Sequence, residues 1–142
     1  MRQAMERDRK MKTVFELKAP NGPPGPLFWA WQPASKGHAL LAVGGADSRV
    51  GIYNNDGTVN DTLKLKGPCV ALEWSKDGSA LAALNSAAPV ATLFDGMKGK
   101  KKEVIAAFAD PMTCMAWSKT SLLLACGSQA GNVLMYNHAN GK

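Results

Sequence analysis

Residues 69–95 read CVALEWSKDGSALAALNSAAPVATLFD, and the fold can be predicted from the order of apolar, turn and aromatic residues within them. An apolar run ends at Trp74, a polar turn follows at Ser75 to Gly78, and small apolar residues come next. A further apolar run then ends in Phe94 and Asp95. An Asp-Gly pair between short apolar runs is typical of a tight β-hairpin, because glycine adopts a positive φ without strain. The stretch therefore predicts three consecutive antiparallel strands.

The same pattern recurs on both sides of this stretch. Trp31 and Trp117 each lie 43 residues from Trp74. A period of about 40 to 45 residues matches one four-stranded propeller blade, since four strands of about five residues and their turns use that length. Closed propellers usually have at least four blades. We therefore predict an all-β fold, a partial β-propeller of about three four-stranded blades in an incomplete ring.

The predicted strands follow one order in every unit. An apolar first strand ends at the tryptophan, a second strand carries small residues, a third ends in an aromatic residue with Asp or Asn, and a fourth is polar. The expected ranges are 27–31, 69–74 and 112–117 for the first strands, 39–43, 79–84 and 121–126 for the second, 50–54, 90–95 and 133–137 for the third, and 58–66 and 102–108 for the fourth. Because both sides of the first strands are mostly apolar, we expect them to be buried on both faces.

The repeats divide the chain into units at about 27–66, 68–108 and 111–142, which form the N-terminal part of a propeller over residues 13–142. Residues 1–12 are polar and charged, and disorder is expected there. Residues 13–18 have the pattern of an outer strand that would complete the last blade of a closed ring. An isolated arc of blades exposes strand edges and apolar faces, so we expect it to aggregate, pair with itself or need a partner.

The positive charge is concentrated in two short segments. Of the formal net charge of +6, residues 1–12 contribute +3 and residues 98–102 contribute +4, so the rest of the chain sums to −1. A nucleic-acid surface needs basic residues distributed over a folded face. This distribution argues against nucleic-acid binding. No run approaches the roughly 18 apolar residues of a membrane span.

The sequence gives no indication of an active site, a metal or a cofactor. Cys69, Cys114 and Cys126 form no CxxC pair and fall in apolar strands, where free buried thiols are expected. His38 and His138 lie in loops without partners at metal-ligand spacing. No GxGxxG, P-loop, HExxH or GxSxG motif occurs. We therefore expect a protein that is not an enzyme.

The repeated residues are expected to have structural roles. Asp47, Asp77 and Asp95 sit at turns and strand ends, where carboxylates bond to nearby backbone. Tryptophans at equivalent strand ends are expected to pack in the core rather than to bind partners. The structural repeat set comprises Trp31, Trp74, Trp117, Asp47, Tyr53, Phe94 and Tyr136.

Two segments resemble the WD-repeat consensus, in which a glycine, a turn aspartate and a final aromatic-Asp pair mark the second and third strands. They are GADSRVGIYN at residues 45–54 and GSQAGNVLMYN at residues 127–137. Ala130 replaces the turn aspartate in the second of them. In the family this aspartate joins a side-chain network with a His, a Ser or Thr and the Trp, so the units that lack it must hold their turns by backbone pairing and packing.

A narrower resemblance covers residues 11–142. The segments FWAWQ at 28–32, CVALEWSKDG at 69–78 and GNVLMYNH at 131–138 resemble the opening of a WD-repeat subunit family of intraflagellar transport complex A. The resemblance implies a scaffold for retrograde ciliary transport and cilium assembly, located in the cilium, at the ciliary base and in the cytoplasm. It implies two kinds of partner, namely other complex A subunits and the remaining blades of the same propeller.

One basic run offers an alternative function. Lys98, Lys100, Lys101 and Lys102 could bind anionic headgroups or an acidic partner, which would make the protein a membrane- or anion-binding WD-repeat adaptor. The simpler interpretation is a solvated hairpin loop between a third and a fourth strand, since a single basic run without aromatic anchors is usually a solvated surface.

Overall fold

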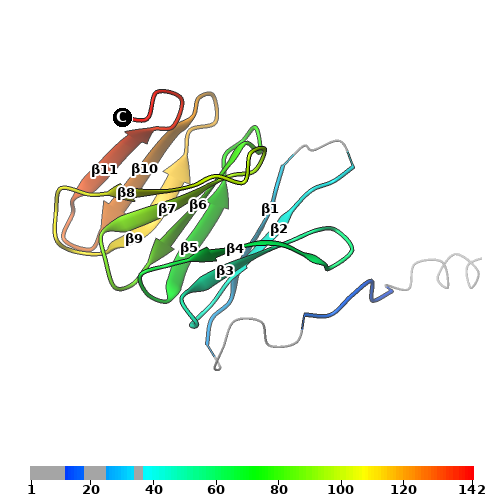
Figure 1. Cartoon of the computed structure of the whole chain (residues 1–142). Helices are drawn as coiled ribbons and strands as arrows, with labels where there is room; N and C mark the ends of the chain where they lie inside the picture. Colours follow the sequence, from blue (N-terminus) through cyan, green and yellow to red (C-terminus); the bar gives the residue numbers. More distant parts are fainter. Residues whose placement is uncertain (1–11, 18–24, 34–36) are drawn as a thin grey trace, which may run out of the picture.

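The computed structural model describes residues 12–17, 25–33 and 37–142, and its regular structure there is entirely β. The strands form three antiparallel sheets (Figure 1). We call these sheets blade 1, blade 2 and blade 3. Blade 1 contains β1 (Phe28–Trp31), β2 (Leu41–Gly44), β3 (Arg49–Tyr53) and β4 (Val59–Lys64); blade 2 contains β5 (Cys69–Trp74), β6 (Ala80–Asn85), β7 (Val90–Asp95) and β8 (Lys101–Ile105); blade 3 contains β9 (Met112–Trp117), β10 (Leu123–Ser128) and β11 (Val133–Asn137).

Each blade is a meander in which neighbours in sequence are neighbours in the sheet. Blades 1 and 2 have four strands and blade 3 has three. These strands match the ranges expected from the sequence to within a few residues at their ends, including the missing fourth strand of the third unit. The all-β fold and the partial propeller are therefore confirmed.

The Asp-Gly turn of blade 2 has the expected geometry. Gly78 has a φ of +74°. The Ser75 N–H donates to the Ala80 carbonyl at 2.7 Å, and the Gly78 N–H donates to the Ser75 carbonyl at 2.9 Å. A side chain at Gly78 would be strained at this φ and would also meet the Pro33 carbonyl oxygen of blade 1. The turn therefore needs glycine for its own shape and for the approach of the neighbouring blade.

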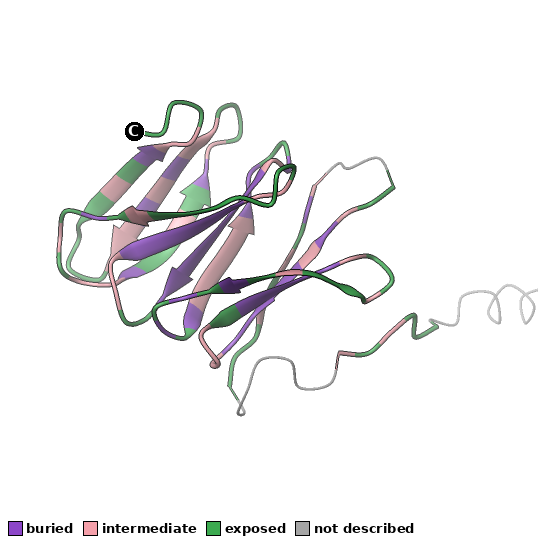
Figure 2. Ribbon diagram, viewed as in Figure 1, coloured by how far each residue is buried: buried purple, intermediate pink, exposed green. Residues whose placement is uncertain are grey.

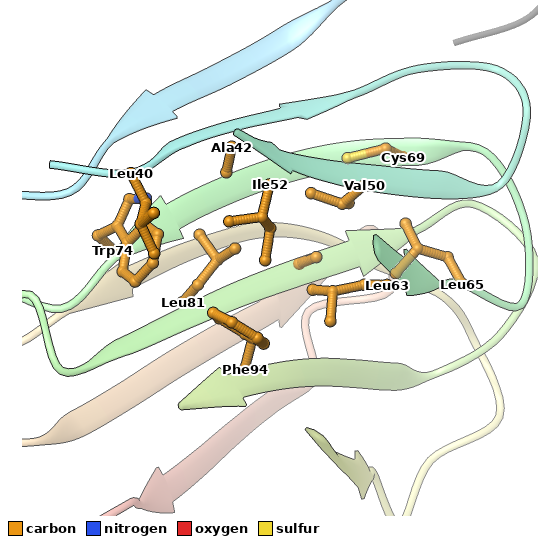
Figure 3. Packing of buried hydrophobic residues seen from close by; sticks show 11 residues of the cluster. Leu40, Ala42, Val50, Ile52, Leu63, Leu65, Cys69, Trp74, Leu81 and Phe94 are labelled. Carbon is orange, nitrogen blue, oxygen red and sulfur yellow. The ribbon is translucent and has the colours of Figure 1, made fainter. Parts of the chain in front are cut away.

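The cores of the molecule lie between blades. One cluster joins blades 1 and 2 and includes Ile52, Leu81 and Phe94 (Figure 3). A second cluster joins blades 2 and 3 and includes Leu84, Leu93 and Leu124. Each blade thus has an apolar face that it can bury only against a neighbouring blade, which explains why the units occur in series.

Blade 2 is the most deeply buried of the three blades, and its second and third strands, β6 and β7, are its most buried part. Every residue of β6 is buried, as is most of β7 (Figure 2). In β6, Leu81 and Ala83 face blade 1, whereas Ala80, Ala82 and Leu84 face blade 3. Alanine on these strands leaves little side-chain bulk between the sheets, so the two neighbouring blades pack closely.

The expectation that the first strands are buried on both faces is wrong for β1 and β9, whereas every residue of β5 is buried or half-buried. In β1 intermediate and exposed residues alternate, and the middle of β9 is largely exposed. Both strands belong to end blades, which among the described residues have a neighbouring blade on one face only, whereas β5 lies in the middle blade. Strands β6 and β7 instead have a neighbour on each side within the sheet and a blade over each face.

The outer strand expected at residues 13–18 is not formed in the described part, 12–17, which has no regular structure. Val14 there is 80% exposed. The ring of Phe15 lies beside Gly57 at the β3–β4 turn. A strand needs a partner edge for its backbone groups, and these residues pair with none of the described strands. The disorder expected for residues 1–12 concerns positions that, apart from Lys12, lie outside the described residues.

Candidate functional site

The tryptophans at the ends of β5 and β9 join the blades. Trp74 and Trp117 are buried. The Trp74 indole N–H donates to the Ala30 carbonyl at 3.1 Å, and the Trp117 indole N–H donates to the Glu73 carbonyl at 3.1 Å. In both cases the donor ends one first strand and the acceptor is the penultimate residue of the preceding first strand. The sequence period therefore corresponds to a repeated contact between blades.

Trp31 differs from its two counterparts. It ends β1 at the equivalent position, yet 51% of it is exposed. The expectation that it packs in the core is wrong for the described structure, because blade 1 has a neighbouring blade on one face only. Trp29 on the same side of β1 is 68% exposed.

The aromatic residues near the ends of the third strands are buried. Tyr53, Phe94 and Tyr136 are all buried, and Phe94 and Tyr136 belong to the two clusters between blades. Phe94 meets Trp74 edge to face, with ring centroids 6.4 Å apart. Burial, with a smaller contribution from the nearby Asp47 carboxylate, raises the pKa of Tyr53 above its usual value. These positions have the packing environment that a structural role requires.

Asp47, Asp77 and Asp95 bond to the turns around them. Asp47 accepts from the Arg49 N–H, Asp77 from the Ser79 N–H and Asp95 from the Met97 and Lys98 N–H groups. Partial burial opposes ionisation of Asp77, but hydrogen bonds led by that from Ser79 lower its pKa below the usual value. Such carboxylates stabilise turns and are not arranged as a catalytic pair.

The basic run from Lys98 to Lys102 is divided between a turn and a strand. Lys98 and Lys100 are exposed in the β7–β8 connection, but Lys101 and Lys102 belong to β8, which corrects the expectation of a loop throughout. The Lys101 ammonium binds the Asp61 carboxylate of blade 1 at 2.8 Å. The Lys102 ammonium donates to the Tyr136 hydroxyl of blade 3 at 2.9 Å. Two of the four lysines thus connect blades.

The cysteines are free, and two of the three are buried. Burial raises the pKa of Cys69 to about 11 and that of Cys126 to about 12. Such thiols stay protonated near neutral pH and are poor nucleophiles. Cys114 is exposed on β9, so the expectation of burial is wrong for this residue, because it lies on the face of blade 3 away from blade 2.

Neither histidine is placed to hold a metal. His38 is exposed, and His138 packs edge to face on Trp117 at a centroid distance of 6.2 Å. The described residues contain no group of three or more His, Cys, Asp or Glu side chains that could hold a metal ion. Within the same ranges, no helix is long and apolar enough to cross a membrane.

Gln32 is a bridging residue that the sequence did not identify. It is buried next to Trp31. Its side-chain amide donates to the Gly78 carbonyl of blade 2 at 2.7 Å, and its side-chain oxygen accepts from the Leu40 N–H at 3.2 Å. Gln32 occupies the position that serine holds in the other two units, Ser75 and Ser118. This difference between the units is the sequence feature that sets Gln32 apart.

A cleft of about 440 Å³ opens between blades 2 and 3. Its lining includes Val70, Met112, Pro111 and Ala130. Asp110 also lines it, but this carboxylate accepts from the Asn132 side chain at 2.9 Å and so fixes the β10–β11 turn. The cleft can receive an apolar group, and nothing in its lining resembles a catalytic set. It joins residues from four separate segments, so no sequence pattern identified it.

Comparison with known proteins places these features in a family. A family model described as the WDR19 first beta-propeller matches residues 27–142. WD repeat-containing protein 19 from Homo sapiens is 35% identical over 132 residues, which are 93% of this chain and 10% of that protein. WD repeat-containing protein dyf-2 from Caenorhabditis elegans is 30% identical over 122 residues, which are 83% of this chain and 8% of that protein. The chain thus spans about a tenth of the length of these relatives.

Proposed function

Since the chain belongs to the WD repeat-containing protein 19 family, we propose that it is part of a non-enzymatic scaffold subunit of intraflagellar transport complex A. In this role it acts in retrograde ciliary transport and cilium assembly, in the cilium, at the ciliary base and in the cytoplasm. The observation that carries the proposal is the family match over residues 27–142, which includes all three blades.

The geometry is consistent with a scaffold. Several polar side chains that the sequence singled out are used within or between blades, as with Asp77 in its turn and Lys102 on Tyr136. What remains at the surface is sheet edge, loop and apolar face. Proteins of this kind act by presenting such surfaces to partners, and the expected partners are other complex A subunits together with the remaining blades of the same propeller.

The test uses the full-length protein that carries this sequence. Tagged in a ciliated cell, it is expected to enter cilia and to co-purify with the complex A subunits. The full-length protein with Val59→Ser serves as a control and is expected to behave in the same way, because this substitution changes an exposed position on the outer strand β4 and leaves both blade interfaces intact. A full-length protein that neither enters cilia nor co-purifies with complex A would contradict the proposal.

The membrane- or anion-binding alternative is not favoured. All four lysines are exposed, but Lys101 is paired with Asp61 and Lys102 is bonded to Tyr136, which leaves Lys98 and Lys100 as the lysines of the run without a side-chain partner among the described residues. Two isolated lysines near an anionic membrane supply only about 2 kcal/mol. We therefore expect that changing Lys98 and Lys100 to Glu leaves sedimentation with phosphatidylserine vesicles unchanged. A clear loss of vesicle binding would restore this alternative.

A further inference from the structure

A groove crosses the outer side of the junction between blades 1 and 2. Its volume is about 310 Å³, and it is lined by residues 62–64 of β4, residues 101–103 of β8 and Thr92 of β7. The first strands β1, β5 and β9 lie against one another, so β4 and β8 form the opposite edges of their sheets (Figure 1). We call this site the rim groove. It lies between two blades that are already in contact, so covering the open faces of blades 1 and 3 does not fill it.

Lysine predominates around the rim groove. The segments 61–66 and 98–103 together hold six lysines and two acidic residues. Asp61 is paired with Lys101 at 2.8 Å, and Glu103 is paired with Lys66 at 3.5 Å. The lysines of these segments that have no carboxylate partner among the described residues are Lys64, Lys98, Lys100 and Lys102. The surroundings of the groove are therefore positively charged and favour an anionic group.

The contacts of Lys101 and Lys102 leave them able to bind a further group. The Lys102 ammonium donates to the Tyr136 hydroxyl at 2.9 Å, but this hydroxyl is neutral and does not cancel the charge. The Lys101 ammonium donates to the Asp61 carboxylate and to the Thr62 carbonyl, both at 2.8 Å. An ammonium group has three donors. Lys102 therefore keeps its charge and two donors, and Lys101 keeps one donor.

Thr92 is the one buried polar residue among those that line the rim groove. Only 5% of it is exposed, and its hydroxyl has no hydrogen-bond partner among the described residues. It pairs with Glu103 in the β7–β8 ladder, which places it below the lysines of β8. A buried hydroxyl is normally satisfied, because leaving it without a partner is costly. An acceptor oxygen that enters the groove would satisfy it.

The walls of the rim groove are strand edges. Three consecutive residues line it from β4 and three from β8, so backbone as well as side chains borders it. An edge strand has N–H and C=O groups that its own sheet does not use, and an extended peptide can pair with them. A lipid headgroup offers negative charge but no peptide backbone. The groove therefore fits an anionic protein segment better than a membrane surface.

We propose that the rim groove binds an acidic segment of a partner protein. A carboxylate of this segment accepts the hydrogen bond of the Thr92 hydroxyl, and Lys64 and Lys102 balance its charge. Neighbouring acidic residues of the segment lie near Lys98 and Lys100 in the β7–β8 connection. The proposal goes beyond the proposed function, because it states the chemistry of a contact that is independent of the complex to which the partner belongs.

The test uses the purified full-length protein that carries this sequence and a fluorescein-labelled octaglutamate peptide. Fluorescence anisotropy is expected to show binding that weakens steeply as salt is added, because the contact is between charges near the surface. An octaglutamine peptide is the control and is expected not to bind. Equal binding of the two peptides, or no octaglutamate binding at low salt, would overturn the proposal.

Substitutions at Thr92 isolate the hydroxyl. Thr92→Val keeps the shape of the side chain and is expected to weaken octaglutamate binding at least about tenfold, since hydrogen bonds to charged groups are among the stronger ones. Thr92→Ser keeps the hydroxyl and is expected to retain most of the affinity. In the free protein, Thr92→Val is expected to leave the melting temperature unchanged or to raise it, because the hydroxyl that it removes is buried without a partner. Unchanged affinity, or a melting temperature lowered by several degrees, would contradict the role of Thr92.

Substitutions of lysine test the charge of the groove. Lys64→Gln and Lys102→Gln are each expected to weaken octaglutamate binding about two- to fivefold. Lys119→Gln is the matched control, because Lys119 is also exposed but lies on the β9–β10 turn outside the groove. An equal loss for Lys119→Gln would show that only the overall charge matters. Unchanged binding with increased self-association would assign Lys64 and Lys102 to the protection of strand edges, and either result rules out the proposal.

Phosphatidylserine vesicles test the other anionic partner. They carry the charge without a peptide backbone, and we expect them not to displace octaglutamate from the full-length protein. Displacement that is lost in Thr92→Val would assign the groove to a membrane surface and overturn the proposal. None of these measurements needs a ciliary partner. Failure to co-purify with complex A would therefore contradict the proposed function alone, and failure to bind octaglutamate would contradict this inference alone.

Discussion

A single kind of residue, the tryptophan at the end of a first strand, performs two tasks at each blade interface. Its ring fills an apolar cluster, as Trp74 does beside Phe94, and its indole N–H satisfies a backbone carbonyl of the neighbouring blade. The ring contributes most of the stabilisation, because apolar burial scales with area. The hydrogen bond fixes the offset between the two blades.

Substitutions at Trp74 separate these two tasks. Trp74→Phe is expected to lower the free energy of unfolding by about 1 to 3 kcal/mol, since it leaves the Ala30 carbonyl without its donor. Trp74→Ala is expected to cost about 3 to 5 kcal/mol because it also leaves a cavity. Urea unfolding followed by circular dichroism measures both. Equal losses for the two variants would show that the hydrogen bond has no separate effect.

The Asp77 turn predicts a dependence on pH. Burial opposes its ionisation, but hydrogen bonds from Ser79 and Ser75 hold its pKa below the usual value. Its stabilising effect is therefore complete above about pH 4 and is lost as the pH falls through the folded pKa. We expect Asp77→Asn to reduce the slope of unfolding free energy against pH between about pH 2 and 4. An unchanged slope would contradict this assignment.

Among the elements, β6 shows how one strand serves two interfaces. Its residues face blade 1 and blade 3 alternately, and all are buried. A strand with a blade over each face cannot accept extra volume on either side. Its small residues are therefore a requirement of its position between sheets rather than of strand formation.

Overpacking tests this role of β6. Ala82 is fully buried against blade 3, so Ala82→Leu is expected to lower the free energy of unfolding by about 1 to 3 kcal/mol. Ala107 lies exposed after β8, and Ala107→Leu is the matched control with an expected change within about 0.5 kcal/mol. Thermal unfolding monitored by circular dichroism compares the two. Similar losses in both variants would contradict a space limit at β6.

At the scale of the whole molecule, three blades make two interfaces and leave two faces open. On its face away from blade 2, blade 1 exposes Trp29 and Trp31, and on its own face away from blade 2, blade 3 exposes Val133 and Met135. The sheets are held to one another by clusters between blades rather than by a closed core. The three-blade unit is therefore fully stable only when another blade or another protein covers the open faces of blades 1 and 3.

This arrangement predicts self-association of the 142-residue chain in isolation. Sedimentation velocity is expected to show oligomers or aggregates at micromolar concentration. Changing Trp29 and Trp31 to Ser is expected to reduce this association, since it removes the largest exposed apolar groups from the face of blade 1 that lies away from blade 2. The same change at Val59, on the outer strand β4, is the control. A monomer that melts cooperatively at all concentrations would contradict the prediction.

The blades could be predicted from local sequence patterns. The Trp31, Trp74 and Trp117 spacing, the Asp77-Gly78 turn and the aromatic ends of the third strands predicted nearly all of the observed strands. These features depend on local chemistry, because alternation, turn residues and strand length are expressed within a few positions of the chain. The family resemblance was also present in these short segments.

Which of these residues are buried, and what they contact, depends on how the blades pack and could not be predicted from the repeats. It placed Trp31 at the surface and Trp74 in the core, although both end equivalent strands, and it gave Lys101 and Lys102 partners on opposite blades. The reason is physical. Burial and pairing depend on whether another blade lies across the face, and that is a property of the arrangement of sheets, which the pattern within one repeat does not contain.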